Sequence, residues 1–142
     1  MRYPHSYGRE KSFIQNQNIT TKIITFAFYQ MELKEKQKKI LDVAVELFKE
    51  KGYMGSSVRD LATKLNIKAA SLYAHIRSKE EILEWICFGI AQEFFDELQE
   101  IKNTDIPPRE KLNLFIEKHL SVVLKNRDVT HIYSNEWKHL EE

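Results

Sequence analysis

Apolar residues recur every three to four positions in several stretches of the chain, which is the spacing of one face of an α-helix. The first such stretch covers residues 34–51 and is followed by Gly52, a residue type that favours the end of a helix. The pattern predicts an amphipathic helix that buries one face against its neighbours. The residues on that face are Ile40, Leu41, Ala44, Leu47 and Phe48.

Residues 57–79 contain two shorter helical patterns joined by a tight turn. Ser57 and Asp60 have the spacing of a capping box, in which each side chain binds the backbone amide of the other, so a helix is expected to begin at Ser57. Asn66 tolerates the left-handed conformation and marks the turn. The pair is expected to bury one face, made of Leu61, Ala62, Leu65, Leu72 and Ile76.

Three further helical patterns follow. One pattern covers residues 79–101 and begins after Ser78. Ser78 is three positions before Glu81, and this spacing predicts that Ser78 caps the start of the helix. Pro107 and Pro108 precede a pattern over residues 109–125, and the last pattern begins before Thr130. These elements predict an all-α fold. The apolar side of residues 109–125 is expected to contain Leu112, Phe115, Ile116, His119, Leu120, Val123 and Leu124.

The helix pair has the size and the exposed cations of a unit that enters a DNA groove. In helix-turn-helix units the first turn of the second helix meets base edges in the major groove. Here that turn is Lys-Ala-Ala-Ser at residues 68–71. Lys68 and Ser71 are expected to make polar contacts, while Ala69 and Ala70 allow close approach and contact with a thymine methyl group. Helix propensity alone is an equally good explanation of the two alanines.

Two residues of the preceding helix are expected on the same surface. Arg59, one turn into that helix, can reach a guanine or a phosphate. The alternative is a solvated surface charge. Ser57 lies at the start of the same helix and completes the expected DNA-facing set from this part of the chain.

The order Ser-Leu-Tyr-Ala-His-Ile at residues 71–76, with Lys79 soon after, is the most specific motif in the chain. Together with Ser57, Leu61 and Ile67 it resembles the N-terminal domain of the TetR family of bacterial transcriptional repressors. Two positions depart from the family pattern. Asn66 stands where the family usually has Gly, and Ile76 stands where it usually has Phe.

The resemblance implies roles that the residues alone do not. Tyr73, His75 and Lys79 are implied to bind DNA phosphates beside the groove. The family's body binds a small molecule, and that binding moves the linking helix so that the two heads of a homodimer no longer match a palindromic operator. An effector pocket is expected to use aromatic residues, whose alternative role is core packing: Trp85, Phe88, Phe94, Phe115, His119 and Tyr133.

The net charge of +1 is divided unevenly along the chain. Residues 34–79 carry +6, residues 80–142 carry −7 and residues 1–33 carry +2. A basic part followed by an acidic part fits a DNA-binding head on a body that does not bind DNA. Double-stranded DNA is therefore an expected partner, and the resemblance to the TetR family implies a second partner, a small-molecule effector of unknown identity.

Several other classes find no support in the sequence. Phosphate-binding glycine loops, nucleophile elbows and His-x-x-x-His metal pairs are absent, so neither an enzyme nor a metal or cofactor site is expected. The single cysteine, Cys87, fits a reducing cytoplasm and a buried position. No apolar run is long enough to cross a membrane. The competing interpretation is a helical protein–protein interaction module without DNA binding.

The domain organisation expected from the sequence has three parts. Residues 1–30 are expected to be a non-native or flexible extension, with Met31 as the native start. Residues 31–78 form the helix-turn-helix DNA-binding domain, and residues 79–142 form the first helices of an incomplete effector-binding and dimerisation domain. The chain is expected to be truncated, since the family's long dimerisation helices have no counterpart in it.

Overall fold

The structure is a computed structural model that describes residues 33–140, so the expectations for residues 1–30 and Met31 lie outside the described residues. Between residues 33 and 140 every regular element is helical, which confirms the all-α prediction. No helix in that range is long and apolar enough to span a membrane. The elements are α3 (Glu35–Lys51), α4 (Val58–Lys64), α5 (Ala69–Leu72), α6 (Lys79–Lys102), α7 (Pro108–Lys125), α8 (Arg127–Glu136) and the 3-10 helix η1 (Trp137–His139).

The ends of the first helices lie where the sequence predicts them. The Ser57 hydroxyl accepts a hydrogen bond from the Asp60 amide at 3.1 Å, and the Asp60 carboxylate accepts one from the Ser57 amide at 3.0 Å. This capping box begins α4. Gly52, with φ of 72°, ends α3, and Asn66, with φ of 53°, forms the turn after α4. Both positions need a backbone conformation that most residues avoid.

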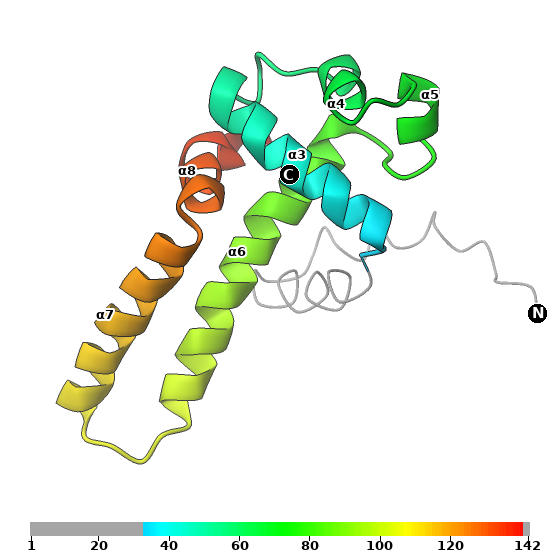
Figure 1. Cartoon of the computed structure of the whole chain (residues 1–142). Helices are drawn as coiled ribbons and strands as arrows, with labels where there is room; N and C mark the ends of the chain where they lie inside the picture. Colours follow the sequence, from blue (N-terminus) through cyan, green and yellow to red (C-terminus); the bar gives the residue numbers. More distant parts are fainter. Residues whose placement is uncertain (1–32, 141–142) are drawn as a thin grey trace, which may run out of the picture.

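One hydrophobic core joins the head, formed by α3, α4 and α5, to the first half of α6 and to α8. Figure 1 shows how these helices are arranged. Leu65, which was expected within this core, is only partly buried at its edge. Because the head shares its core with α6, a movement of α6 must repack the head. The principal buried residues are Ile40, Ala44, Leu47, Phe48, Tyr53, Leu61, Leu72, Ile76, Ile82, Leu83, Trp85, Ile86, Cys87 and Ile132.

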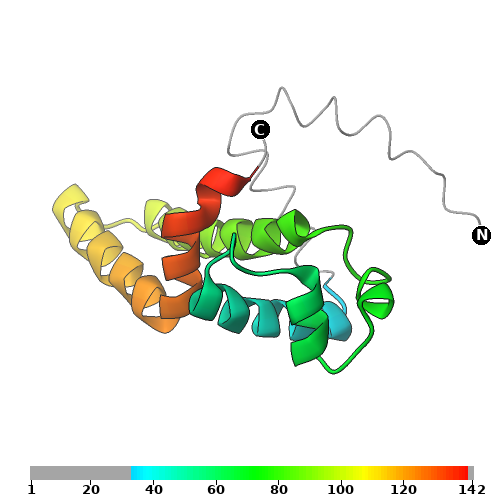
Figure 2. The ribbon, with the colours of Figure 1, turned by 90° about the horizontal axis from the view of Figure 1, so that it is seen from above.

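α6 and α7 run in opposite directions as a long hairpin, and α8 returns the chain to the head (Figures 1 and 2). α7 ends at Asn126, whose amide donates to the carbonyl of Val122 at 3.0 Å. The return of α8 is fastened by an ion pair of 2.8 Å between Lys49 and Asp128. At the far end of α8, the Glu136 carboxylate accepts a hydrogen bond from the Tyr53 amide at 3.2 Å.

The apolar side of α7 is only partly covered. Val122 is the only residue of α7 that is fully buried, while Phe115 and Val123 are half-buried against neighbouring helices. Within the described part of the chain, nothing packs over the outer edge of this side. That edge consists of large side chains that are about half exposed or more: Leu112, Ile116, Leu120 and Leu124.

Candidate nucleic-acid interface

The second helix of the pair is shorter than the sequence predicts. α5 covers only Ala69–Leu72, with Lys68 as its N-cap residue. Beyond it the amides of His75 and Ile76 both donate to the carbonyl of Leu72, at 2.9 and 3.2 Å, so the chain continues in tight turns. Leu72 and Ile76 remain buried, and the turns therefore hold the segment on the core as a longer helix would.

The start of α5 presents a small exposed surface. Lys68, Ala70 and Ser71 are all exposed, whereas Ala69 is half-buried and packs against the core. Ala69 therefore does not face outward as expected. The reason is helical spacing, because Ala69 is three positions before the buried Leu72 and lies on the same face. Of the two alanine methyl groups, only that of Ala70 is free to approach a base.

The N-terminal end of α4 contributes two further residues. Arg59 is exposed, and among the described residues it has no ion-pair partner. Ser57 is exposed as well, but its hydroxyl is engaged with Asp60. The hydrogen bond from Ser57, followed in importance by that from Lys51, lowers the pKa of Asp60 from 3.8 to about 2. The capping carboxylate thus stays charged at any physiological pH.

The turns after α5 are anchored to the first turn of α3. The Gln37 side-chain amide donates to the carbonyl of His75 at 3.2 Å. Tyr73 is 54% exposed and projects its ring beyond the core, while the His75 side chain is half-buried. No sequence pattern marked Gln37, because a side chain that binds a distant backbone carbonyl leaves no periodic signal.

Lys79 has internal partners that the sequence did not suggest. Its ammonium donates to the backbone carbonyls of Tyr53, at 2.9 Å, and Ser56, at 3.0 Å. It also lies 4.0 Å from the centre of the Tyr53 ring, within the range of a cation–π interaction. Lys79 therefore ties the loop between α3 and α4 to the start of α6.

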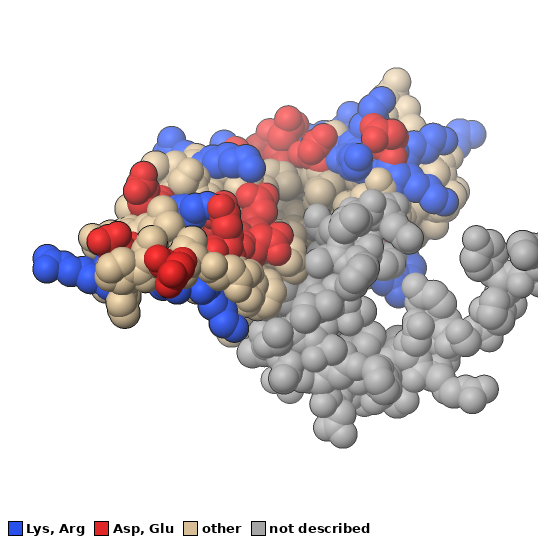
Figure 3. Space-filling model, turned by 90° about the horizontal axis from the view of Figure 1, so that it is seen from below, with Lys and Arg blue, Asp and Glu red and all other residues tan. Residues whose placement is uncertain are grey.

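On the face that Figure 3 shows, charge is distributed unevenly between the two ends of the molecule. Lysine and arginine side chains predominate at the head end, and acidic side chains group over the α6–α7 side, with some lysines and arginines among them. A phosphate backbone is attracted to the first region and repelled by the second. The field of the protein thus favours an approach of DNA to the head.

The six residues predicted for an effector pocket do not meet in one cavity. Trp85 lines a cleft of about 570 Å³ between α3, α6 and the junction of α7 with α8, and the other five lie outside its lining. Phe94 and His119 stack between α6 and α7 with ring centres 4.5 Å apart, and Phe115 lies 5.6 Å from His119. Tyr133 packs at the edge of the head core, and Phe88 is half-buried on α6.

Known proteins match this chain in sequence. Residues 40–86 match the family described as bacterial regulatory proteins, tetR family. The transcriptional repressor KstR2 of Rhodococcus jostii is 30% identical over 105 residues, which are 74% of this chain and 52% of KstR2. The biofilm operon regulator IcaR of Staphylococcus aureus is 54% identical over 46 residues, which are 32% of this chain and 25% of IcaR.

Solved structures match the fold. The ketosteroid regulator KstR2 of Mycobacterium tuberculosis superposes with a TM-score of 0.71 and 26% identity, over 77% of this chain and 56% of that one. PfmR, a TetR family regulator of Thermus thermophilus, superposes with a TM-score of 0.66 and 34% identity, over 72% of this chain and 56% of PfmR. The chain thus spans about half the length of KstR2 and PfmR.

These relatives are named as transcriptional repressors or regulators, and theirs is not a family of enzymes. The matched segment holds the capped α4, the turn at Asn66 and the exposed start of α5. By sequence and by fold, the chain belongs to the TetR family of transcriptional regulators.

Proposed function

We propose that this chain is part of a sequence-specific DNA-binding transcriptional regulator, a repressor that a small-molecule effector releases from a palindromic operator. The observation that carries the proposal is the exposed start of α5. Lys68, Ala70 and Ser71 face outward there, while Leu72 fixes the segment on the core. A short helix held in this way can enter a major groove with its first turn toward the bases.

Each contact residue has a distinct task in this proposal. Lys68 and Ser71 read base edges, Ala70 allows close approach, and Arg59 reaches a guanine or a phosphate from α4. Ser57 lies beside Arg59 and caps α4. Its hydroxyl proton is directed to Asp60, so its main contribution is to fix the helix that carries Arg59.

Three residues are proposed to bind phosphates and so to set affinity and register. Tyr73 offers its exposed phenol and His75 its imidazole. Lys79 has three ammonium protons, and two of them already point at the carbonyls of Tyr53 and Ser56. The third is left for a phosphate, which the N-terminus of the 24-residue α6 also attracts.

The remaining parts of the proposal concern the whole regulator. Residues 31–78 act as the DNA-binding domain and residues 79–142 as the start of an effector-binding and dimerisation domain. The regulator works in the cytoplasm as a homodimer, and the aromatic residues on α6, α7 and α8 contribute to its effector pocket. The ion pair of Lys49 with Asp128 and the bond from Tyr53 to Glu136 support a coupling of that domain to the head.

The test is a selection of bound DNA from a random pool with the 142-residue chain. Enrichment of one motif is expected, as a half-site for a monomer or as a palindrome for a dimer. The double variant Lys68→Ala and Ser71→Ala should lose the enrichment. The control variant Lys102→Ala, at the exposed far end of α6, should keep it. A pool without any enriched motif would contradict the proposal.

The alternative is a helical interaction module that does not bind DNA. The exposed outer edge of α7, formed by Leu112, Ile116, Leu120 and Leu124, favours a protein contact at that side. The two functions are separated by retention on a DNA column. A DNA-binding head is released progressively as salt rises, whereas an interaction module passes through at every salt concentration.

A further inference from the structure

The cleft of about 570 Å³ beside Trp85 lies between α3 of the head and the helices α6 and α8. Leu41 and Val45 contribute to it from α3, Trp85 and Ile90 from α6, and Val129 from α8. Gly89 of α6 also lines the cleft and, having no side chain, leaves it open. The walls are thus mainly apolar, and a volume of this size is typical of small-molecule sites.

The polar residues of the cleft are all neutral or acidic. The negative charge of Glu93 is already balanced, since its carboxylate accepts a hydrogen bond of 2.8 Å from Asn126 and lies 3.6 Å from the ammonium of Lys125. Asp96 is different. Within residues 33–140 no lysine or arginine pairs with it, and its carboxylate accepts a hydrogen bond from the side-chain amide of Gln92. Asp96 therefore places an uncompensated negative charge at the rim.

Gln92, which lies beside Asp96, adds a second feature to the same part of the cleft. The Asp96 carboxylate can only accept, so the Gln92 atom that faces it must be the amide nitrogen. This orientation leaves the Gln92 oxygen buried without a hydrogen-bond partner among the described residues. A buried acceptor that lacks a partner costs free energy until a donor reaches it.

We propose that this cleft binds an amphipathic organic ammonium ion. Its apolar body lies against Leu41, Val45 and Trp85. Its N–H groups donate to the Gln92 oxygen, and its positive charge is balanced by Asp96. A neutral ligand of the same shape lacks the charge interaction, and an anion is repelled by Asp96. The cleft is thus selective for cations by charge and for amines by hydrogen bonding.

The test uses Trp85 as the reporter. The substitution Trp137→Phe removes the other tryptophan, which is 59% exposed in η1, and leaves the fluorescence of Trp85 alone. Three ligands of matched shape are titrated: 4-phenylbutylamine, 4-phenylbutanol and 4-phenylbutyrate. The amine is expected to shift the Trp85 emission saturably and to bind about tenfold more tightly than the alcohol, because one ion pair at a partly exposed rim contributes about 1.4 kcal/mol.

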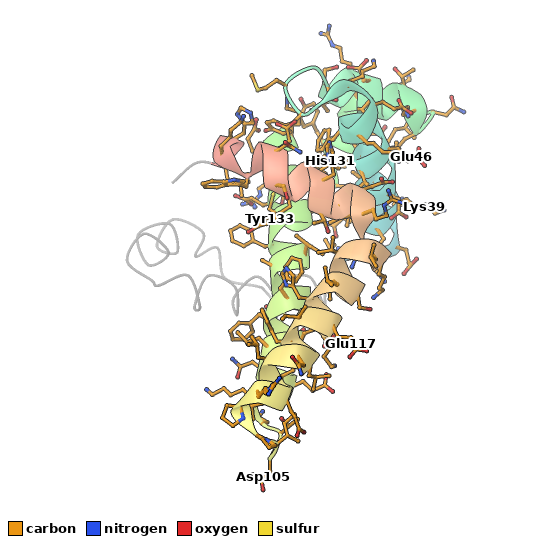
Figure 4. The ribbon with its side chains drawn as sticks, turned by 90° about the vertical axis from the view of Figure 1, so that its left-hand side faces the viewer. Lys39, Glu46, Asp105, Glu117, His131 and Tyr133 are labelled. Carbon is orange, nitrogen blue, oxygen red and sulfur yellow. The ribbon has the colours of Figure 1, made fainter. Side chains whose placement is uncertain are left out.

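Two further variants make the result decisive. Asp96→Asn should reduce the preference for the amine to about twofold or less, whereas Asp105→Asn, at the tip of the hairpin (Figure 4), should keep it. Gly89→Leu should abolish the response to all three ligands without loss of helical content. Equal affinities for the three ligands, or a preference that survives Asp96→Asn, would overturn the proposal. No DNA is present in these titrations, so their outcome is independent of the proposed DNA-binding function.

Discussion

Lys79 holds the loop before α4 in place, since its ammonium lies 2.9 Å from the carbonyl oxygen of Tyr53. The side chain of Tyr53 makes a second contact with α6, because its hydroxyl donates a hydrogen bond to the Glu80 carboxylate at 2.9 Å. His139 of η1 stacks on the Tyr53 ring with the ring centres 5.5 Å apart. Tyr53 thus connects the head, the start of α6 and the end of α8, and Lys79 is part of that junction as well as a proposed phosphate ligand.

The first prediction separates the two roles of Lys79. Lys79→Ala should lower the free energy of unfolding by about 1–2 kcal/mol, because two hydrogen bonds from a charged donor are lost. It should also weaken binding to specific and random DNA alike and reduce the salt slope by about 1. Urea denaturation and DNA titrations at several salt concentrations measure the two effects. Lys68→Ala is the matched control, since Lys68 is exposed and should affect DNA binding only.

The second prediction concerns the exposed methyl group at the start of α5. Ala70→Glu places a carboxylate where the proposal puts a base edge, so DNA affinity should fall at least about tenfold. Stability should change by less than about 0.5 kcal/mol, because the position is exposed. Asn113→Glu, on the exposed side of α7, is the control for an added charge. Unchanged DNA binding by Ala70→Glu would remove α5 from the interface.

Local signals in the sequence predicted the head well. The Ser57–Asp60 capping box, Gly52 and Asn66 depend on neighbouring residues alone, and each was found where its chemistry required it. Features that depend on contacts between distant segments were not predictable. Lys79 reads as a free cation in the sequence, and only the folded chain brings the carbonyl of Tyr53 within its reach.

The same limit of sequence-based prediction applies to α6, α7 and α8. Helical periodicity correctly indicated an apolar side on α7, but periodicity does not say what covers such a side. The aromatic residues predicted for one pocket are instead divided between a cleft, a ring cluster and the core edge. Their identity as large apolar residues was evident, whereas their grouping depends on how α6, α7 and α8 cross.

The third prediction tests the turn between α4 and α5. Asn66 has a φ of 53°, a conformation that glycine adopts freely and β-branched residues avoid. Asn66→Gly, which restores the residue usual in the family, should change the free energy of unfolding by less than about 0.5 kcal/mol. Asn66→Ile should lower it by about 1–2 kcal/mol. If both variants unfolded at the same urea concentration, the turn would not require this conformation.

The fourth prediction is a pH dependence at the start of α4. The Asp60 pKa is lowered from 3.8 to about 2 in the folded chain. A carboxyl group whose pKa is lower in the folded chain stabilises the fold above pH 3.8, and this stabilisation is lost as the pH falls towards 2. The thermal midpoint of the native chain should therefore fall over this range by more than that of Asp60→Asn, which lacks the titrating group. Parallel pH profiles for the two proteins would show that Asp60 contributes nothing to this dependence.

The last prediction concerns the thiol of Cys87, which burial and then the charge of Glu136 raise from a pKa of 9.0 to about 12. The thiolate is the reactive form, so Cys87 should react with a disulfide reagent at pH 8 at least about 100-fold more slowly in the native chain than in denaturant. Ser121→Cys in a Cys87→Ala background supplies an exposed thiol on α7 as the control and should react rapidly in both states. The Cys87 thiol ionises near pH 9 in the unfolded chain and only near pH 12 in the folded chain. The free energy of unfolding should therefore also decrease as the pH rises from 9 to 12. Rapid native labelling would mean that the core around Cys87 opens far more readily than its burial in α6 implies.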